Sequence, residues 1–175
     1  MLQHWHGTTQ LIQQALAEDE VAIDHTSALL PDDLMSEALM MPKSDGVLAG
    51  VDVALAVWRA VDPSLETQVL VPDGSAVERG MNVAVIRGRM SSILRGERTA
   101  LNFVQRLSGI ATCTRQFVDA ADGRTVVLDT RKTTPLLRVL EKYSVRVGGG
   151  VNHRAGLDAG ILIKDNHVRL AGGVR

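Results

Sequence analysis

Three stretches of the chain carry apolar residues every three or four positions: residues 8–18, 51–61 and 90–121. This spacing puts the apolar side chains on one face of a helix, so each stretch is predicted to be helical. The stretch 51–61 is almost continuously apolar, which indicates a buried helix. We expect the long third helix to be interrupted near Gly109, because glycine weakens a helix interior.

Short apolar or β-branched runs predict strands between these helices, at residues 36–41, 67–71 and 83–87. Turn signals separate them, for example Pro72-Asp73-Gly74. The first part of the chain is therefore predicted to be an α+β layer, with helices on one face of a sheet. We place this N-terminal domain at residues 1–105.

The pattern changes after residue 121. A β-branched run at 125–128 predicts a buried strand, and a helix is expected to start with Thr134 as its cap and Pro135 as its first residue. The glycines at 148–150 then stop regular structure, and the apolar run 161–163 predicts a second strand. This alternation is typical of parallel α/β folds, which place their chemistry just after the carboxyl ends of strands. We place the second domain at residues 106–175.

Composition narrows the class of protein. Of the 175 residues, 45% are hydrophobic and 22% charged, as in ordinary globular proteins, and aromatic residues make up only 3%. The single cysteine, Cys113, excludes an internal disulfide and is expected to be a small core residue. Neither a leader segment nor a membrane span is visible. We expect a soluble cytoplasmic protein.

Charge is unevenly distributed along the chain. Residues 1–130 contain 10 Lys and Arg against 17 Asp and Glu, whereas residues 131–175 contain 9 against 3. A basic segment with few aromatic residues suggests a small polyanionic ligand rather than nucleic acid. A solvated basic face is the simpler alternative.

The candidate chemistry lies in three polar clusters: Thr130-Arg131-Lys132, Asn152-His153-Arg154 and Lys164-Asp165-Asn166-His167. Each cluster alone has an ordinary interpretation as surface charge or a structural histidine. The first and third clusters follow predicted parallel strands. Their cations are therefore expected to converge on the one face of the fold at which the carboxyl ends of these strands lie. Arginine suits planar carboxylates and lysine suits phosphate oxygens, which predicts a ligand with several such groups. The sequence shows no metal-ligand set.

Six segments together resemble the quinolinate phosphoribosyltransferase family: residues 97–103, 107–112, 128–135, 141–143, 148–154 and 162–167. They occur in the family's order, and the match is specific from about residue 90 to residue 168. The regions 11–27 and 46–50 match less tightly, and residues 20–24 lack glycines that the family has there.

The resemblance implies an open-faced α+β sandwich followed by part of a seven-stranded type II phosphoribosyltransferase α/β barrel. It implies the transfer of phosphoribose from phosphoribosyl pyrophosphate to quinolinate, with Mg²⁺, to give nicotinate mononucleotide, pyrophosphate and CO2. It also implies a homodimer with shared active sites.

The same resemblance assigns roles to individual residues. Arg131, Arg154 and Lys164 would bind the quinolinate carboxylates, and Thr130 and His153 would line that pocket. Lys132 would meet phosphoribosyl pyrophosphate, so Lys132 and Lys164 are the catalytic candidates. Arg98 would reach the site of the neighbouring subunit.

The chain also departs from the family. A complete β/α barrel takes about 250 residues, and the acidic Mg²⁺ ligands and glycine-rich phosphate loops of the family have no counterpart here. We therefore expect a truncated chain without turnover of its own. The alternatives are an inactive or split-enzyme fragment, a molybdenum-operon pyrophosphorylase-like relative, a non-catalytic dimer-forming protein and, less favoured, a nucleic-acid module.

Overall fold

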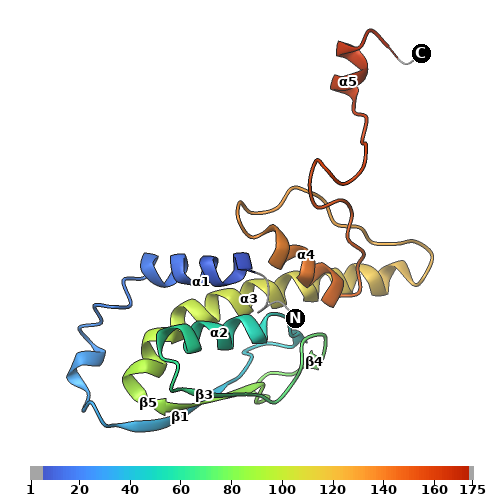
Figure 1. Cartoon of the computed structure of the whole chain (residues 1–175). Helices are drawn as coiled ribbons and strands as arrows, with labels where there is room; N and C mark the ends of the chain where they lie inside the picture. The colour runs from blue at the N-terminus through green and yellow to red at the C-terminus, as the bar shows by residue number, and fades with distance from the viewer. Residues whose placement is uncertain (1–5, 174–175) are drawn as a thin grey trace.

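An antiparallel sheet organises the N-terminal half of the computed structural model, which describes residues 6–173 (Figure 1). Its strands β1 (Met35–Met40), β3 (Glu66–Val69) and β5 (Ala84–Arg89) are arranged in the order β1-β5-β3. All three predicted strands are confirmed, with ends shifted by one or two residues. A separate ribbon pairs β2 (Gly46–Val47) with β4 (Ala76–Val77), and two residues per strand are too few to leave a sequence pattern.

Helices cover one face of this sheet (Figure 1). They are α1 (His6–Glu18), α2 (Val51–Val61) and α3 (Met90–Ala121), and a short 3₁₀ turn, η2 (Ser27–Leu29), precedes β1. The α2 side chains fill the core, since Val53, Ala54 and Val57 are fully buried. The indole Nε1 of Trp58 donates a 2.9 Å hydrogen bond to the Ile93 carbonyl of α3. The predicted one-sided α+β sandwich is confirmed.

Helix α3 is the longest element and continues without a break through Gly109. Its 32 residues make a rod about 48 Å long. The predicted interruption is wrong, because a single glycine lowers helix stability without stopping the helix when flanking residues are packed. Cys113 is exposed, contrary to the predicted core position, because its side of α3 faces away from the packed layers. Since α3 crosses residue 105, the boundary between the two predicted domains remains a prediction.

The second half is built around α4 (Arg138–Val147), which lies along α3 (Figure 1). Leu128, which precedes α4 in the sequence, pairs with Val151, which follows α4, in a parallel bridge. The predicted strand 125–128 is reduced to this single pairing. The predicted helix start at Thr134 is wrong. Leu136 adopts φ +67°, a left-handed conformation that a helix cannot include, and α4 begins only at Arg138.

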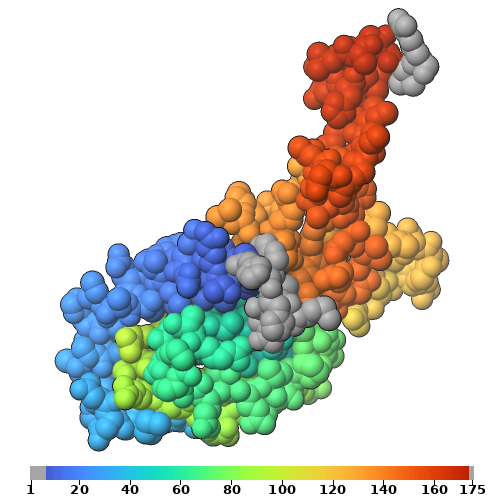
Figure 2. Space-filling view, in the orientation of Figure 1, coloured from blue at the N-terminus to red at the C-terminus, as the bar shows by residue number. Residues whose placement is uncertain are grey.

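The predicted strand 161–163 is also wrong. Within the described part of the chain this segment has no strand beside it, and Ile161 is 95% exposed. A strand needs a neighbour for its backbone hydrogen bonds, so the apolar run stays extended and unpaired. It leads to the short helix α5 (Asp165–Leu170), which stands away from the body as an arm (Figures 1 and 2). None of the helices between residues 6 and 173 has the length and apolar character of a membrane crossing.

Candidate functional site

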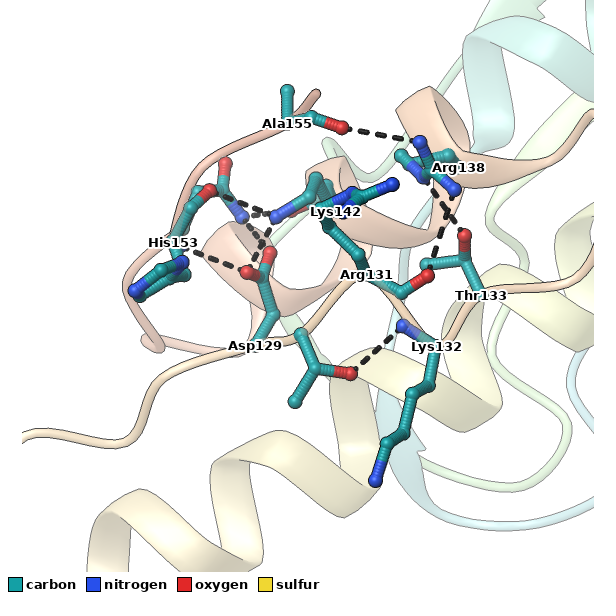
Figure 3. Close-up of polar contacts among 10 residues, drawn as sticks. Asp129, Arg131, Lys132, Thr133, Arg138, Lys142, His153 and Ala155 are labelled. Carbon is teal, nitrogen blue, oxygen red and sulfur yellow. Dashed lines mark hydrogen bonds and ion pairs between the residues drawn. The ribbon is translucent and has the colours of Figure 1, made fainter. Parts of the chain in front are cut away.

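Two loops begin directly after the paired residues Leu128 and Val151 (Figure 3). We call residues 129–135 the first loop and residues 152–155 the second loop. The bridge is held by hydrogen bonds from the Val151 amide to the Val127 carbonyl and from the Asp129 amide to the Val151 carbonyl, 2.9 and 3.2 Å long. The chain runs in the same direction through both residues, so both loops emerge at the same end.

A buried ion pair joins the loops to α4. The Lys142 ammonium lies 2.5 Å from Oδ1 of Asp129, and the two side chains are 7% and 6% exposed. Lys142 also donates to the His153 carbonyl at 2.9 Å, and the His153 amide donates to Asp129 Oδ1 at 2.8 Å. The Asn152 amide nitrogen donates to Asp129 Oδ2 at 2.6 Å. One carboxylate of the first loop thus organises the start of the second (Figure 3).

Arg138 makes a second connection, one helical turn before Lys142 (Figure 3). Its Nε donates to the Thr133 hydroxyl at 3.1 Å, and Nη2 donates to the Arg131 carbonyl at 3.5 Å, both in the first loop. Its Nη1 donates to the Ala155 carbonyl of the second loop at 3.1 Å. All three guanidinium nitrogens therefore bind oxygen atoms of the protein itself.

Glu141 fixes the far end of the first loop. Its carboxylate accepts hydrogen bonds from Arg106 Nε of α3 at 3.0 Å and from the Thr134 amide at 3.2 Å. Arg106 also donates to the Thr134 hydroxyl. Burial raises the pKa of Glu141, but the hydrogen bonds from Arg106 and Thr134 outweigh it and leave that pKa below its ordinary value. The carboxylate is therefore charged at neutral pH.

Five of the predicted site residues lie in these loops: Thr130, Arg131, Lys132, His153 and Arg154. The Thr130 hydroxyl accepts from the Lys132 amide at 3.0 Å, and both side chains are exposed. The Lys132 side chain points away from the Asp129–Lys142 pair (Figure 3). His153 is exposed, and the half-buried Arg154 donates to the Gly160 carbonyl at 3.0 Å. Arg131 is half-buried, and its Nε atom is buried without a hydrogen-bond partner among the described residues.

Two predicted residues lie elsewhere. Lys164 is exposed at the start of α5, where its backbone amide donates to His167 Nδ1 at 3.0 Å. The predicted convergence of Lys164 with Arg131 is absent from this structure, because the run 161–163 does not pair beside Leu128. Arg98 is exposed on α3, in the N-terminal half.

Positive charge exceeds negative charge at the loops. Asp129 is paired with Lys142 and Glu141 with Arg106. Between residues 6 and 173 no carboxylate pairs with Arg131, Lys132, Arg138 or Arg154. Cations that share a region without counter-charges favour binding of an anion. The described residues contain no group of three or more His, Cys, Asp or Glu side chains that could hold a metal ion, and the expected Mg²⁺ remains a prediction.

Three residues that build this arrangement, Asp129, Arg138 and Lys142, were not among the predicted site residues, and Asn152 was in a predicted cluster but had no role assigned to it. A signal was present, because Arg138 and Lys142 are four positions apart and must share one face of the helix. Asp129 is also the first polar residue after the apolar run 125–128.

Comparisons with known proteins cover almost the whole chain. The family model "Quinolinate phosphoribosyl transferase, N-terminal domain" matches residues 24–108, and the corresponding C-terminal domain model matches residues 110–175. A relative from Synechocystis sp., named as a probable nicotinate-nucleotide pyrophosphorylase (carboxylating), is 49% identical over 93% of this chain. Quinolinate phosphoribosyltransferase (decarboxylating) 1b of Nicotiana tabacum is 45% identical over 94%.

A solved structure agrees with these matches. The nicotinate-nucleotide pyrophosphorylase from Francisella tularensis superimposes with a TM-score of 0.91 and 40% identity over 95% of this chain. The chain spans about half the length of its relatives: 56% of the Synechocystis protein, 47% of the tobacco protein and 60% of the Francisella structure.

Proposed function

Since the chain belongs to the quinolinate phosphoribosyltransferase family, we propose that its two loops bind quinolinate for phosphoribosyl transfer. The reaction joins quinolinate to phosphoribosyl pyrophosphate and yields nicotinate mononucleotide, pyrophosphate and CO2. It would be a step of NAD biosynthesis, and the names of the relatives, which include nicotinate-nucleotide pyrophosphorylase and quinolinate phosphoribosyltransferase, fit this reaction. This chain would contribute the part of the active site that is formed by the two loops.

The observation that carries this proposal is the unpartnered Nε of Arg131. A buried donor without an acceptor is costly, about 1–3 kcal/mol and more for a charged group. If the Arg131 side chain shifts so that this buried atom becomes accessible, a carboxylate would satisfy the donor and neutralise its charge, in the bidentate geometry that arginine favours. Quinolinate offers two adjacent carboxylates, so a second cation is needed.

We propose Arg154 for the second carboxylate, with Thr130 and His153 lining the pocket. Lys132, exposed in the first loop, would bind the pyrophosphate group of the second substrate. Lys164 would contribute once the segment 161–164 packs beside the loops. Arg98 would serve the site of a neighbouring copy in a homodimer. Its exposure on α3, without an ion-pair partner in the described part of the chain, supports this assignment.

The chemistry of the proposed reaction depends on orientation and charge. The pyridine nitrogen forms a bond to the anomeric carbon of the ribose as the bond to pyrophosphate breaks. Arg131 and Arg154 would fix the ring for this attack, and Lys132 would stabilise the negative charge of the departing pyrophosphate. The ring nitrogen then carries positive charge and stabilises the electron pair that stays on the adjacent ring carbon when CO2 departs, and a proton adds to that carbon.

Three further assignments are proposals of the same kind. Mg²⁺ would require ligands beyond those that residues 6–173 offer, so no step is assigned to it here. A cytoplasmic location fits a soluble enzyme, although some plant relatives are named as chloroplastic or mitochondrial. The expected dimer would be tested by measuring the mass of the protein in solution.

Binding of quinolinate tests the proposal. In calorimetric or NMR titrations, we expect quinolinate to bind more tightly than nicotinate, which lacks the 2-carboxylate. Arg131→Ala should weaken quinolinate binding about tenfold or more, because a hydrogen bond between charged groups contributes about 1.5–3 kcal/mol. Arg79→Ala, an exposed site in the N-terminal half, is the control and should leave the affinity unchanged. Equal affinity for both ligands, or equal effects of the two substitutions, would contradict the proposal.

A further inference from the structure

We propose that Arg138 and Lys142 are positioning residues that form a clamp, holding the two loops at a fixed separation and thereby selecting two adjacent carboxylates over one. This inference rests on the proposed function, because it concerns how that site recognises quinolinate. It adds two residues that were not predicted to be part of the site.

The geometry places both residues where a clamp requires them. They are four positions apart on α4, so their side chains leave the same face of the helix. Each of them contacts both loops. Arg138 donates to the Arg131 and Ala155 carbonyls, and Lys142 donates to the Asp129 carboxylate and the His153 carbonyl. The backbone of both loops is therefore hydrogen-bonded to side chains of one helix, α4 (Figure 3).

The hydrogen bonds distinguish the clamp from the ligand-binding residues. Each of the three guanidinium nitrogens of Arg138 donates to an oxygen of the protein. Lys142 is buried and ion-paired with Asp129. Arg131, by contrast, keeps a buried Nε without a partner among the described residues. Arg138 and Lys142 are thus committed to the loops, whereas Arg131 has a donor left for a ligand.

The helix that carries the clamp is itself well fixed. Glu141 ties it to Arg106 of α3, and Leu140 on its inner face is 1% exposed. At its end, a Cβ atom on Gly148 would lie 2.4 Å from the Ala111 carbonyl, which shows how closely α4 approaches α3. A clamp on a rigid base can fix the spacing of two loops that have little regular structure.

Selectivity follows from this spacing. A ligand with one carboxylate needs only one loop and its cation. A ligand with two adjacent carboxylates needs both loops at the correct distance, and a misplacement of about 1 Å at an orienting site can cost about a hundredfold. Loosening the clamp should therefore weaken dicarboxylate binding much more than monocarboxylate binding.

The experiment compares two ligands in one variant. Arg138→Gln removes the three-way connection at a half-buried position, where the chain should still fold. In titrations we expect quinolinate affinity to fall about tenfold or more, the scale seen when supporting contacts of a site are removed. Nicotinate affinity should change less than about threefold. Partial unfolding cannot imitate this result, because it lowers the apparent affinity for every ligand by the same factor.

Two further variants complete the design. Ile86→Val destabilises the N-terminal core, far from the loops, and should leave the ratio of quinolinate to nicotinate affinity unchanged. Lys142→Met alone would strand the Asp129 charge and can unfold the chain. The double variant Asp129→Asn/Lys142→Met avoids this, and it should also lose selectivity. If either clamp variant keeps the wild-type ratio of quinolinate to nicotinate affinity, the proposal that Arg138 and Lys142 form a clamp is wrong.

A second measurement separates failure of the clamp from failure of the proposed function. If the wild-type chain shows no preference for quinolinate, the proposed function fails, and hydrogen exchange then decides the clamp. The His153 amide donates to Asp129, whereas the Val151 amide belongs to the bridge. Faster exchange at His153 with unchanged exchange at Val151 in the double variant supports the clamp. Unchanged exchange at both amides overturns it.

Discussion

At the scale of single residues, Asp73 connects the two halves of the chain. Its carboxylate accepts hydrogen bonds from the Gly50 and Val51 amides, 2.7 and 3.1 Å long, at the start of α2. The Tyr143 hydroxyl of α4 donates to the same carboxylate at 2.7 Å. The Asp73 side chain thus caps the start of α2 and also accepts a hydrogen bond from α4. The Pro72-Asp73-Gly74 turn signal predicted neither role.

Tyr143 predicts how stability depends on alkaline pH. Burial, followed by the hydrogen bond to Asp73 and its charge, raises the pKa of the phenol well above its ordinary value of 10.0. Stability from the protonated phenol is therefore fully present below pH 10 and is lost as the pH rises, because the unfolded chain releases the proton first.

Tyr143→Phe should lower the free energy of unfolding by about 1–2 kcal/mol at pH 8. The difference from wild type should shrink above pH 10. Urea unfolding of both proteins from pH 8 to values above pH 10 measures it. A difference that stays constant across the range would show that the phenol is not held protonated by the fold.

At the scale of elements, α3 shows how the same residue type can have opposite effects along one helix. A Cβ atom on Gly96 would lie 2.5 Å from Cδ1 of Trp58, so α2 approaches α3 closely there. A Cβ atom on Gly109 would have no neighbour within 4 Å among the described residues. One glycine is required by packing, and the other is open to replacement.

We therefore expect Gly109→Ala to stabilise the protein by about 0.5–1 kcal/mol, since alanine is the better helix former. Gly96→Ala should destabilise it by about 1–3 kcal/mol, because the indole is held by its hydrogen bond to Ile93 and cannot move freely. Thermal or urea unfolding of the two variants measures both effects. Equal signs for the two substitutions would contradict the packing described for α2 and α3.

The sequence predicted elements well where local pattern and tertiary packing agree. The apolar run 51–61 matches α2 at both ends, because its side chains are buried on nearly all sides. The first strands and α3 were also found. Prediction failed where distant contacts decide. Glu141 takes the Thr134 amide, and Leu136 adopts a positive φ, so the expected helix start is moved to Arg138.

The candidate site was predicted only in part, for a similar reason. The polar clusters after the apolar run 125–128 and after the glycines 148–150 predicted Thr130, Arg131, Lys132, His153 and Arg154, which all lie in the two loops. The sequence pattern could not show that Lys142 would be buried against Asp129, since a lysine in a helix is ordinarily solvated. It also placed Lys164 beside Arg131, which requires a strand that the described residues do not form.

At the scale of the whole molecule, burial of apolar side chains decreases from the N-terminal layer to the arm. The core of α2, β5 and α3 is apolar and closed, while residues of the arm, such as Ile161 and Leu170, are 95% and 83% exposed. Leu128 and Val151 beside the loops are also about half exposed. The candidate site therefore lies where the packed part of the molecule gives way to open surface.

This arrangement predicts the activity of the 175 residues alone. We expect no release of CO2 from carboxyl-labelled quinolinate in the presence of phosphoribosyl pyrophosphate and Mg²⁺. Helix α5, which follows Lys164 directly, stands away from the body of the molecule, and the described residues contain no group of three or more side chains that could hold a metal. Quinolinate binding by the same preparation is the positive control. Release of labelled CO2 at a rate that Arg131→Ala abolishes would contradict this expectation.

The shared carboxylate of Asp73 has a consequence for the sequence of events during synthesis. The ribosome delivers the chain from its amino end, so the turn at 72–74 and the start of α2 exist well before Tyr143 emerges. We therefore expect the Asp73 carboxylate to be oriented by the two amides before the phenol arrives. The earlier half would thus provide a binding position for the later half. A substitution at Asp73 should first impair the docking of α4 while the chain is being synthesised.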